Sequence, residues 1–192
     1  VTTTGAPNDA FGLLGGDGGW MVVDPNDAGH VVASYQYGGM FRFRNNRARD
    51  ISPPFKPEES GGVWMVYITI DPNDSNTLYT GNQRVYRSRN DGESWDALTP
   101  VLDNSPITAI EVAPASSKHI YVGTENGGVF RSLDGGGTWS GNLGGGTLPG
   151  VTVTRIETAP GNANHVVVTV ANFGNRHVFR STDAGSSWVD ID

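Results

Sequence analysis

Cysteine is absent from the 192-residue chain, and lysine is nearly so. Without cysteine there is no disulfide framework, no thiolate zinc site and no cysteine nucleophile. Lys56 and Lys118 are the only lysines among 13 basic residues, and the formal net charge is −7. A chain with this balance lacks the basic stripe that neutralises a phosphate backbone, so nucleic acid is not expected as a partner.

Long apolar runs and helical periodicity are also missing. No segment has the roughly eighteen consecutive apolar residues of a membrane span, so we expect none. The first residues have neither the basic nor the apolar part of a signal peptide, so we expect any such peptide to be removed already or to lie upstream. Glycine (27) and proline (11) are frequent, which predicts short strands separated by turns.

Two sequence markers recur together at intervals of 42 to 49 residues. Such a period is typical of propeller blades. The first marker is a proline turn ahead of a short apolar strand: Asp24-Pro25, Asp71-Pro72, Ala113-Pro114 and Ala159-Pro160. The second marker is an aromatic residue followed by arginine: Phe41-Arg42, Tyr86-Arg87, Phe130-Arg131 and Phe179-Arg180.

A third marker, the Asp-box pattern S-x-[DN]-x-G-x-[ST]-W, follows three of the four aromatic-arginine pairs. The Asp or Asn side chain is expected to accept nearby backbone amides, Gly to take a conformation that other residues avoid, and Trp to pack beneath the turn. We therefore assign the box residues a structural role. They are Ser88, Asn90, Gly92 and Trp95; Ser132, Asp134, Gly136 and Trp139; and Ser181, Asp183, Gly185 and Trp188.

The markers predict an all-β propeller built of four-stranded antiparallel blades with Asp-box turns. We place the blades at 15–60, 61–104, 105–149 and 150–192, with 1–14 as the tail of a preceding blade or a closing strand. The first unit lacks the Gly and Trp of the box. Alternation places one residue set on a packed face of each first strand: Met21 and Val23, Ile68 and Ile70, Ile110 and Val112, Ile156 and Thr158.

With these motifs, the chain resembles the bacterial BNR or Asp-box repeat β-propellers. This superfamily includes sortilin-like domains, photosystem II assembly factors, sialidases and xyloglucan-active hydrolases with tandem propellers. Its members usually have six or more blades, which implies that the four blades here are an arc of a larger ring. In the tandem-propeller hydrolases an aspartate precedes the Gly-Gly pair that matches Gly38-Gly39. Here that position is Gln36, which has no titratable carboxyl group.

The remaining polar motifs favour structure over catalysis. In the third unit, Glu125 lies two residues before Gly127-Gly128, as Gln36 lies two residues before Gly38-Gly39. No second carboxylate is evident to complete a catalytic pair with it. The arginines recur once per blade. The repeat histidines, His30, His119 and His165, recur in three of the four units, with Thr77 in that place in the second, so neither set is expected to converge on one ligand or metal ion. We predict no catalytic residue, metal or cofactor, and we expect Arg155 to pair with Glu111 of the preceding blade.

Aromatic and amide residues gather in the first two units, a combination that suits stacking on a sugar ring with hydroxyl recognition. The candidate ligand-binding residues are Trp20, Tyr35, Gln36, Tyr37, Trp64, Tyr67 and Glu125. Interblade packing is the alternative role for these rings.

Two functions remain open. The first is a non-catalytic binding or scaffold propeller of a secreted or surface bacterial protein, recognising a glycan or a protein segment. The second is a fragment of a glycoside hydrolase, xyloglucanase-like or sialidase-like, with its catalytic carboxylates partly outside the chain. We expect missing blades of a parent chain or a second copy to cover the open blade faces, although closure with four blades is a further option.

Overall fold

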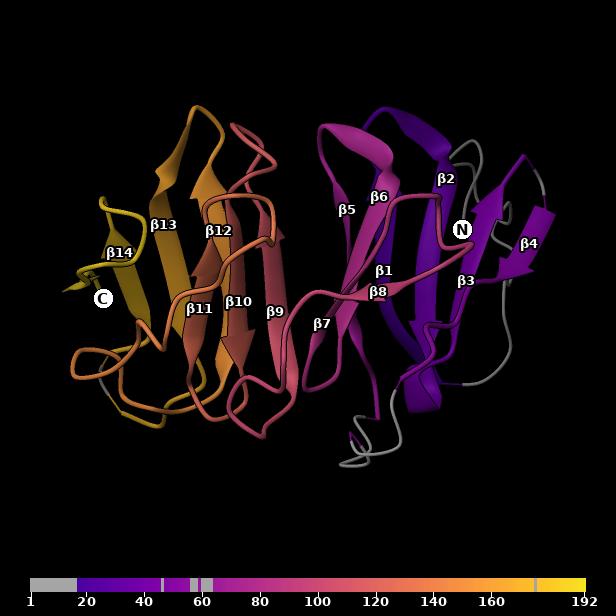
Figure 1. Cartoon of the computed structure of the whole chain (residues 1–192). Coiled ribbons are helices and arrows are strands. Elements are labelled where there is room, and N and C mark those ends of the chain that lie inside the picture. The colour runs from indigo at the N-terminus through magenta and orange to yellow at the C-terminus, as the bar shows by residue number, and fades with distance from the viewer. Residues whose placement is uncertain (1–16, 46, 56–58, 60–63, 175) are drawn as a thin grey trace, which may run out of the picture.

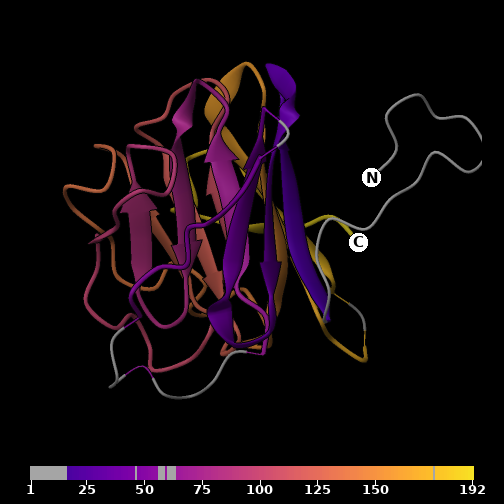
Figure 2. The same ribbon diagram turned by 90° about the vertical axis from the view of Figure 1, so that its right-hand side faces the viewer.

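The computed structural model describes residues 17–45, 47–55, 59, 64–174 and 176–192. Its strands form successive antiparallel sheets, three with four strands and one with three, which confirms the predicted β-propeller architecture. Figure 1 shows the sheets side by side, and Figure 2 views them from the side of the first sheet. No described helix has the length and apolar character needed to cross a membrane.

We number the sheets as blades 1 to 4 in chain order, each running outward from its first strand. Blade 1 contains β1 (Gly18–Asp24), β2 (Asp27–Tyr35), β3 (Met40–Arg44) and β4 (Arg47–Asp50). Blade 2 contains β5 (Tyr67–Asp71), β6 (Asp74–Gly81), β7 (Val85–Ser88) and β8 (Asp96–Ala97). Blade 3 contains β9 (Ile107–Val112), β10 (Ile120–Thr124) and β11 (Val129–Ser132). Blade 4 contains β12 (Val153–Ala159), β13 (Asn162–Val170), β14 (Val178–Ser181) and β15 (Val189–Asp190). The predicted tail or closing strand at 1–14 lies outside the described residues.

The fourth strand predicted for blade 3 is replaced by an irregular segment. Ser140 and Leu143 still donate their amides to carbonyl groups of β11, at 2.9 and 2.7 Å. Between them, however, the Asn142 side chain accepts the amide of Val129 at 3.0 Å, in the place of a backbone carbonyl. The outer edge of blade 3 is therefore hydrogen-bonded without forming a regular ladder.

Neighbouring blades pack face to face through alternating side chains. Ile110 and Val112 of blade 3 pack against Tyr67 and Tyr79 of blade 2, and Ile156 of blade 4 joins the next cluster in the same way. Burial of these apolar faces is the main stabilising contribution expected for the arc.

The expectation of a packed face was wrong for the first blade. Met21 and Val23 are 56% and 45% exposed, whereas the equivalent Ile68 and Ile110 are 3% and 1% exposed. In blades 2 to 4 this face is covered by the preceding blade, and no described residues cover it in blade 1. Alternation identified the correct face of the strand, but burial depends on the neighbouring blade.

The Asp-box turns have closely similar hydrogen-bond patterns. In blade 3, the Gly136 amide donates to Ser132 Oγ at 2.8 Å, and the Thr138 amide donates to Asp134 Oδ1 at 2.8 Å. Gly136 has a φ of +92°, a left-handed conformation that suits glycine. In blade 4, the indole of Trp188 donates to the carbonyl of Leu143 in the preceding segment at 3.1 Å. The box therefore closes a turn, and in blades 2 and 4 its tryptophan also bonds to the preceding blade.

The repeated arginines connect each blade to the Asp-box turn of the next. Arg42 donates to the carbonyl of Asp91 at 2.7 Å, and Arg87 donates to that of Gly135 at 2.7 Å. Arg131 donates to the carbonyl of Ala184 in the same way. Arg180 is exposed and forms no such bond within the described part of the chain. The arginine is thus an interblade clamp.

This arrangement predicts that Arg131→Ala destabilises the protein more than Arg180→Ala. Loss of the Arg131 clamp leaves turn carbonyls without a charged donor, which costs about 1–3 kcal/mol. Arg180 has no corresponding contact to lose. The free energy of unfolding of both variants, measured by urea denaturation, tests this difference. Equal destabilisation would contradict the clamp.

The box carboxylates also predict how stability depends on pH. The Thr138 amide lowers the pKa of Asp134 to about 2, and the Ser187 hydroxyl lowers that of Asp183 to about 2. A lowered pKa stabilises the folded state above the ordinary value of 3.8. That contribution is lost as the pH falls through about 2.

We therefore expect the double variant Asp134→Asn and Asp183→Asn to show a flatter stability profile between pH 4 and pH 2 than the parent protein. Asn90 shows that an amide can occupy this place in a box: its Oδ1 accepts the Ser94 amide at 2.9 Å. Thermal unfolding across this pH range is the measurement. Asp96→Asn, at an exposed aspartate in β8, is the control and should retain the parent profile.

Candidate functional site

Two exposed aromatic rings meet where blade 1 adjoins blade 2. Tyr37 lies in the short 3-10 turn Gln36–Gly38 between β2 and β3, and Trp64 lies just before β5. The Tyr37 amide donates to the Trp64 carbonyl at 3.0 Å. The ring centroids are 5.0 Å apart with an edge-to-face angle of 74°. Tyr37 is 76% exposed and Trp64 is 48% exposed, so the pair presents aromatic surface to solvent.

The backbone at Tyr37 is held in an unfavourable conformation. Its φ is +62°, in the left-handed region that a bulky residue rarely adopts. The amide of Tyr35 donates to the carbonyl of Gly39 at 2.9 Å, which closes the loop around this residue. Local strain of this kind is found preferentially at functional sites, where surrounding structure maintains it.

A second group of side chains lies on the inner strands. Trp20 of β1 and Tyr67 of β5 have ring centroids 4.8 Å apart. The Tyr67 hydroxyl accepts Arg155 Nη1 at 2.9 Å, and the guanidinium carbon lies 5.9 Å from the tyrosine ring centroid. Trp20 is partly exposed and Tyr67 is buried, so the group extends from the solvent-exposed surface into the interface between blades.

Arg155 does not pair with Glu111 as the sequence suggested. It binds Glu157 two residues along its own strand, with Nε and Nη2 each 2.6 Å from Oε1. Glu111 instead accepts the amide and hydroxyl of Thr158 at 3.1 and 2.7 Å. Side chains two apart on a strand share a face, which makes the local pair geometrically accessible.

Glu111 has the chemistry of a proton donor or acceptor near neutral pH. Burial raises its pKa to about 7, and the charge of Glu157 raises it further against the lowering effect of Thr158. Perturbed carboxyl groups are enriched at functional sites, but they also occur at structural contacts. The bonds to Thr158 place Glu111 in the contact between blades 3 and 4.

The other predicted ligand-binding residues are dispersed. The Gln36 side-chain oxygen accepts the amide of Asp17 at 3.1 Å. The Tyr35 ring packs near Phe41, with centroids 5.7 Å apart. Glu125 is exposed in the loop between β10 and β11 of blade 3, so the structure gives no contact that joins it to the aromatic pair.

The repeat histidines occupy separate environments. His30 is buried, with Nδ1 3.1 Å from Asp24 Oδ2 and Nε2 2.9 Å from Asp91 Oδ1. His119 is partly buried in blade 3 and His165 is exposed in blade 4. Across the described residues, no group of three or more His, Asp or Glu side chains is arranged to hold a metal ion. The histidine of blade 1 therefore links two aspartates of adjacent blades.

Sequence reasoning missed the roles of His30 and of an arginine-rich hairpin formed by β3 and β4. The sequence does contain a signal for this hairpin: an arginine stands at every second position on both sides of a pair of asparagines. The His30 bridge had no such signal, because Asp91 belongs to another blade.

The raised pKa of Glu111 predicts a pH-dependent loss of stability. Because the folded-state value is about 7 against an ordinary 4.5, ionisation disfavours the folded state as the pH rises between these values. Glu111→Gln retains an acceptor for Thr158 but cannot ionise. We expect the variant to gain about 1–3 kcal/mol relative to the parent at pH 8 and little at pH 4. Urea denaturation at both pH values tests this, with exposed Glu125→Gln as the control.

Known proteins that are similar to this chain are Asp-box propellers. The family model described as Sortilin-Vps10 (sortilin, neurotensin receptor 3) matches residues 83–192, more than half of the chain. A xyloglucanase of Acetivibrio thermocellus is 24% identical over 222 residues, covering 93% of this chain and 26% of the relative. A xyloglucanase of a Paenibacillus species is 27% identical over 152 residues, covering 69% of this chain and 15% of the relative. The chain thus spans between 15% and 26% of these two curated relatives.

Solved structures give the same fold. The GH74 xyloglucanase of Xanthomonas campestris has a TM-score of 0.75 at 18% identity, over 92% of this chain and 30% of that one. The structure of YCF48 bound to a D1 peptide has a TM-score of 0.54 at 16% identity, over 88% of this chain and 45% of that one. At these identities the likeness shows the propeller fold alone.

Proposed function

The chain belongs to the Sortilin-Vps10 family, and we propose that it forms the part of a β-propeller that binds a neutral glycan of the xyloglucan type. The observation that carries this proposal is the exposed Tyr37–Trp64 pair at the junction of blades 1 and 2. The names of the similar xyloglucanases supply the choice of glycan.

The aromatic pair suits the apolar faces of sugar rings. A pyranose presents axial C–H groups that pack against an aromatic face, while its hydroxyl groups bond to nearby polar atoms. A backbone hydrogen bond from Tyr37 to Trp64 at 3.0 Å joins the two loops, and the rings themselves are in edge-to-face contact. Little conformational entropy is then lost when a sugar binds.

We propose that the chain binds without catalysing hydrolysis by itself. Gln36 lacks a titratable carboxyl, and Glu111 bonds to Thr158 in the interblade contact. Glycoside hydrolysis requires two carboxylates at a defined separation across the scissile bond. Glu125 is exposed on blade 3 but has no contact with the aromatic pair, so the proposed site does not provide that arrangement.

A second candidate is a part of a glycoside hydrolase whose remaining carboxylates lie in a larger protein. Two observations favour it: the curated relatives are named xyloglucanases, and Glu111 has a pKa of about 7. Release of reducing ends from xyloglucan by this chain, abolished in Glu111→Gln, would support the second candidate over the first.

We also propose that further blades, in a longer chain or a second copy, cover the outer face of blade 1. That face carries exposed Met21 and Val23 on β1. Packing of a neighbouring sheet there would bury apolar surface as it does between blades 2 and 3. A glycan polymer is too large to enter a cell unaided, so we place the protein outside a bacterial cell or on its surface.

Glycan binding predicts that Trp64→Ala weakens the affinity for xyloglucan oligosaccharides about two- to twelve-fold, as expected for loss of about 0.5–1.5 kcal/mol of aromatic contact. Tyr37→Ala should have a similar effect, because it removes the partner ring. Isothermal titration calorimetry measures both. Phe173→Ala, which removes a fully exposed aromatic ring outside the proposed site, is the matched control and should leave the affinity unchanged.

Undiminished affinity in both Trp64→Ala and Tyr37→Ala would contradict the proposed site. Absence of measurable binding in the parent chain would contradict the proposed ligand.

A further inference from the structure

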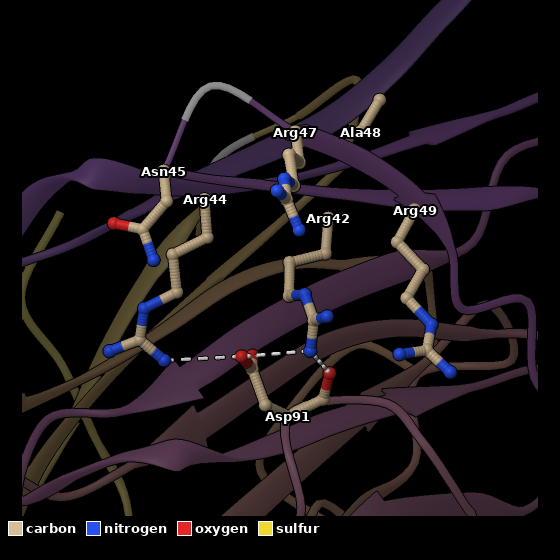
Figure 3. Close-up of a pocket in the computed structure, with 7 residues that line it drawn as sticks. All are labelled: Arg42, Arg44, Asn45, Arg47, Ala48, Arg49 and Asp91. Carbon is tan, nitrogen blue, oxygen red and sulfur yellow. Dashed lines mark hydrogen bonds and ion pairs between the residues drawn. The ribbon is translucent and has the colours of Figure 1, made fainter.

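Four arginines form a two-by-two array on one face of the outer hairpin of blade 1. Arg42 lies directly opposite Arg49, and Arg44 lies directly opposite Arg47. Figure 3 shows their side chains extending to the same side as Asp91 of blade 2. Together with Asn45 and Ala48, these residues line a pocket of about 540 Å³.

The array is specific to blade 1. The corresponding turns of blades 2 to 4 hold Asp-boxes, and the position of Arg44 is occupied there by Arg89, Leu133 and Thr182. Arg42 holds the position that carries an arginine in every blade, and it clamps the turn of blade 2, so it has a structural role. The fold does not require the other three arginines, so their presence needs a different explanation.

Like charges placed directly opposite one another in a sheet are destabilising. Asp91 partly offsets the array, with Oδ2 2.9 Å from Arg42 and 3.1 Å from Arg44. Glu93 pairs with Arg49 and lies 3.4 Å from Arg42. Asp27 approaches Arg44 Nε at 3.6 Å.

The charges are not fully balanced. Four guanidinium groups face three carboxylates, and Asp91 is shared further with His30, whose Nε2 lies 2.9 Å from Oδ1. The Arg47 side chain forms no ion pair or hydrogen bond with the described residues, and it extends toward Arg42 (Figure 3). Arg49 is 59% exposed in its side chain, so it is also accessible to a ligand. An excess of positive charge is thus concentrated in a protein of net charge −7.

We propose that this pocket binds the carboxylates of an acidic polysaccharide, such as a chain of uronic acids. A guanidinium group presents two parallel N–H donors that match the two oxygens of a carboxylate. Arg47 and Arg49 are two residues apart on β4, about 7 Å at the usual rise of a strand. Successive acidic sugars of one polymer can therefore contact both.

The choice of a polysaccharide rests on the proposed glycan-binding function. The site is separate from the Tyr37–Trp64 pair: it lies on the outer strands of blade 1, whereas the aromatic pair lies in the loop after β2 and before β5. A protein of this kind would hold a neutral glycan and an acidic one at two places.

The test is titration of the protein with an oligogalacturonate, in the parent chain and in Arg47→Gln. We expect the variant to bind about tenfold more weakly, as loss of a charge-assisted pair of about 1.5 kcal/mol implies. Parent binding should also weaken with added salt, because the pocket is open to solvent. Arg180→Gln, which removes an exposed and unpaired arginine of blade 4, is the matched control. Neither variant should lower the melting temperature of the parent, since Arg47→Gln relieves a like-charge contact with Arg44 and Arg180 is unpaired.

Each alternative outcome overturns the proposal. Equal affinity of the parent and of Arg47→Gln for the oligogalacturonate would show that the pocket is not the binding site. Inorganic sulfate or phosphate that binds as tightly as the oligogalacturonate would indicate a general oxyanion site. A polyglutamate peptide that binds more tightly would indicate an acidic protein partner. Xyloglucan binding measured in the same variants separates this result from the proposed function, since Arg47→Gln should leave it unchanged.

Discussion

The contact that sets the geometry of the arc is the clamp between an arginine of one blade and the Asp-box turn of the next. A sheet can pack against its neighbour at many angles, because apolar contact is not directional. The guanidinium donors of Arg42, Arg87 and Arg131 add direction, since each must reach a particular turn carbonyl. The box forms that turn through its own hydrogen bonds. Local turn geometry and interblade geometry are therefore set by the same residues.

Blade 1 lacks an Asp-box at its outer turn, and residues of this blade contribute to both candidate ligand sites. Its outer turn has an arginine array in the place of a box, and its inner loop contains the strained Tyr37. Apart from the clamp residue Arg42, the residues in these positions do not serve the repeat, so they are free to serve recognition. The remaining blades carry the repeated Asp-box turn and have no exposed aromatic pair of this kind among their described residues.

The candidate site was only partly predictable. Tyr37 and Trp64 stood in the predicted aromatic group, but their contact across two blades depends on the loop after β2 meeting the segment before β5. Arg155 and Glu111 are a plausible pair on equivalent strands, yet Arg155 finds a nearer carboxylate at Glu157. Glu111 gains its raised pKa from burial, a property that no local spacing reports.

The amino-acid sequence by itself determined the repeat, the order of the strands within the blades apart from the fourth strand of blade 3, and the chemistry of the Asp-box turns. These features follow from interactions between residues close in the chain, such as Ser132, Asp134 and Gly136. Only the tertiary structure decided which faces are buried and which charges meet. Met21 and Ile68 have the same place in the repeat, but one is exposed and the other packed, because burial depends on a sheet that another part of a chain must supply.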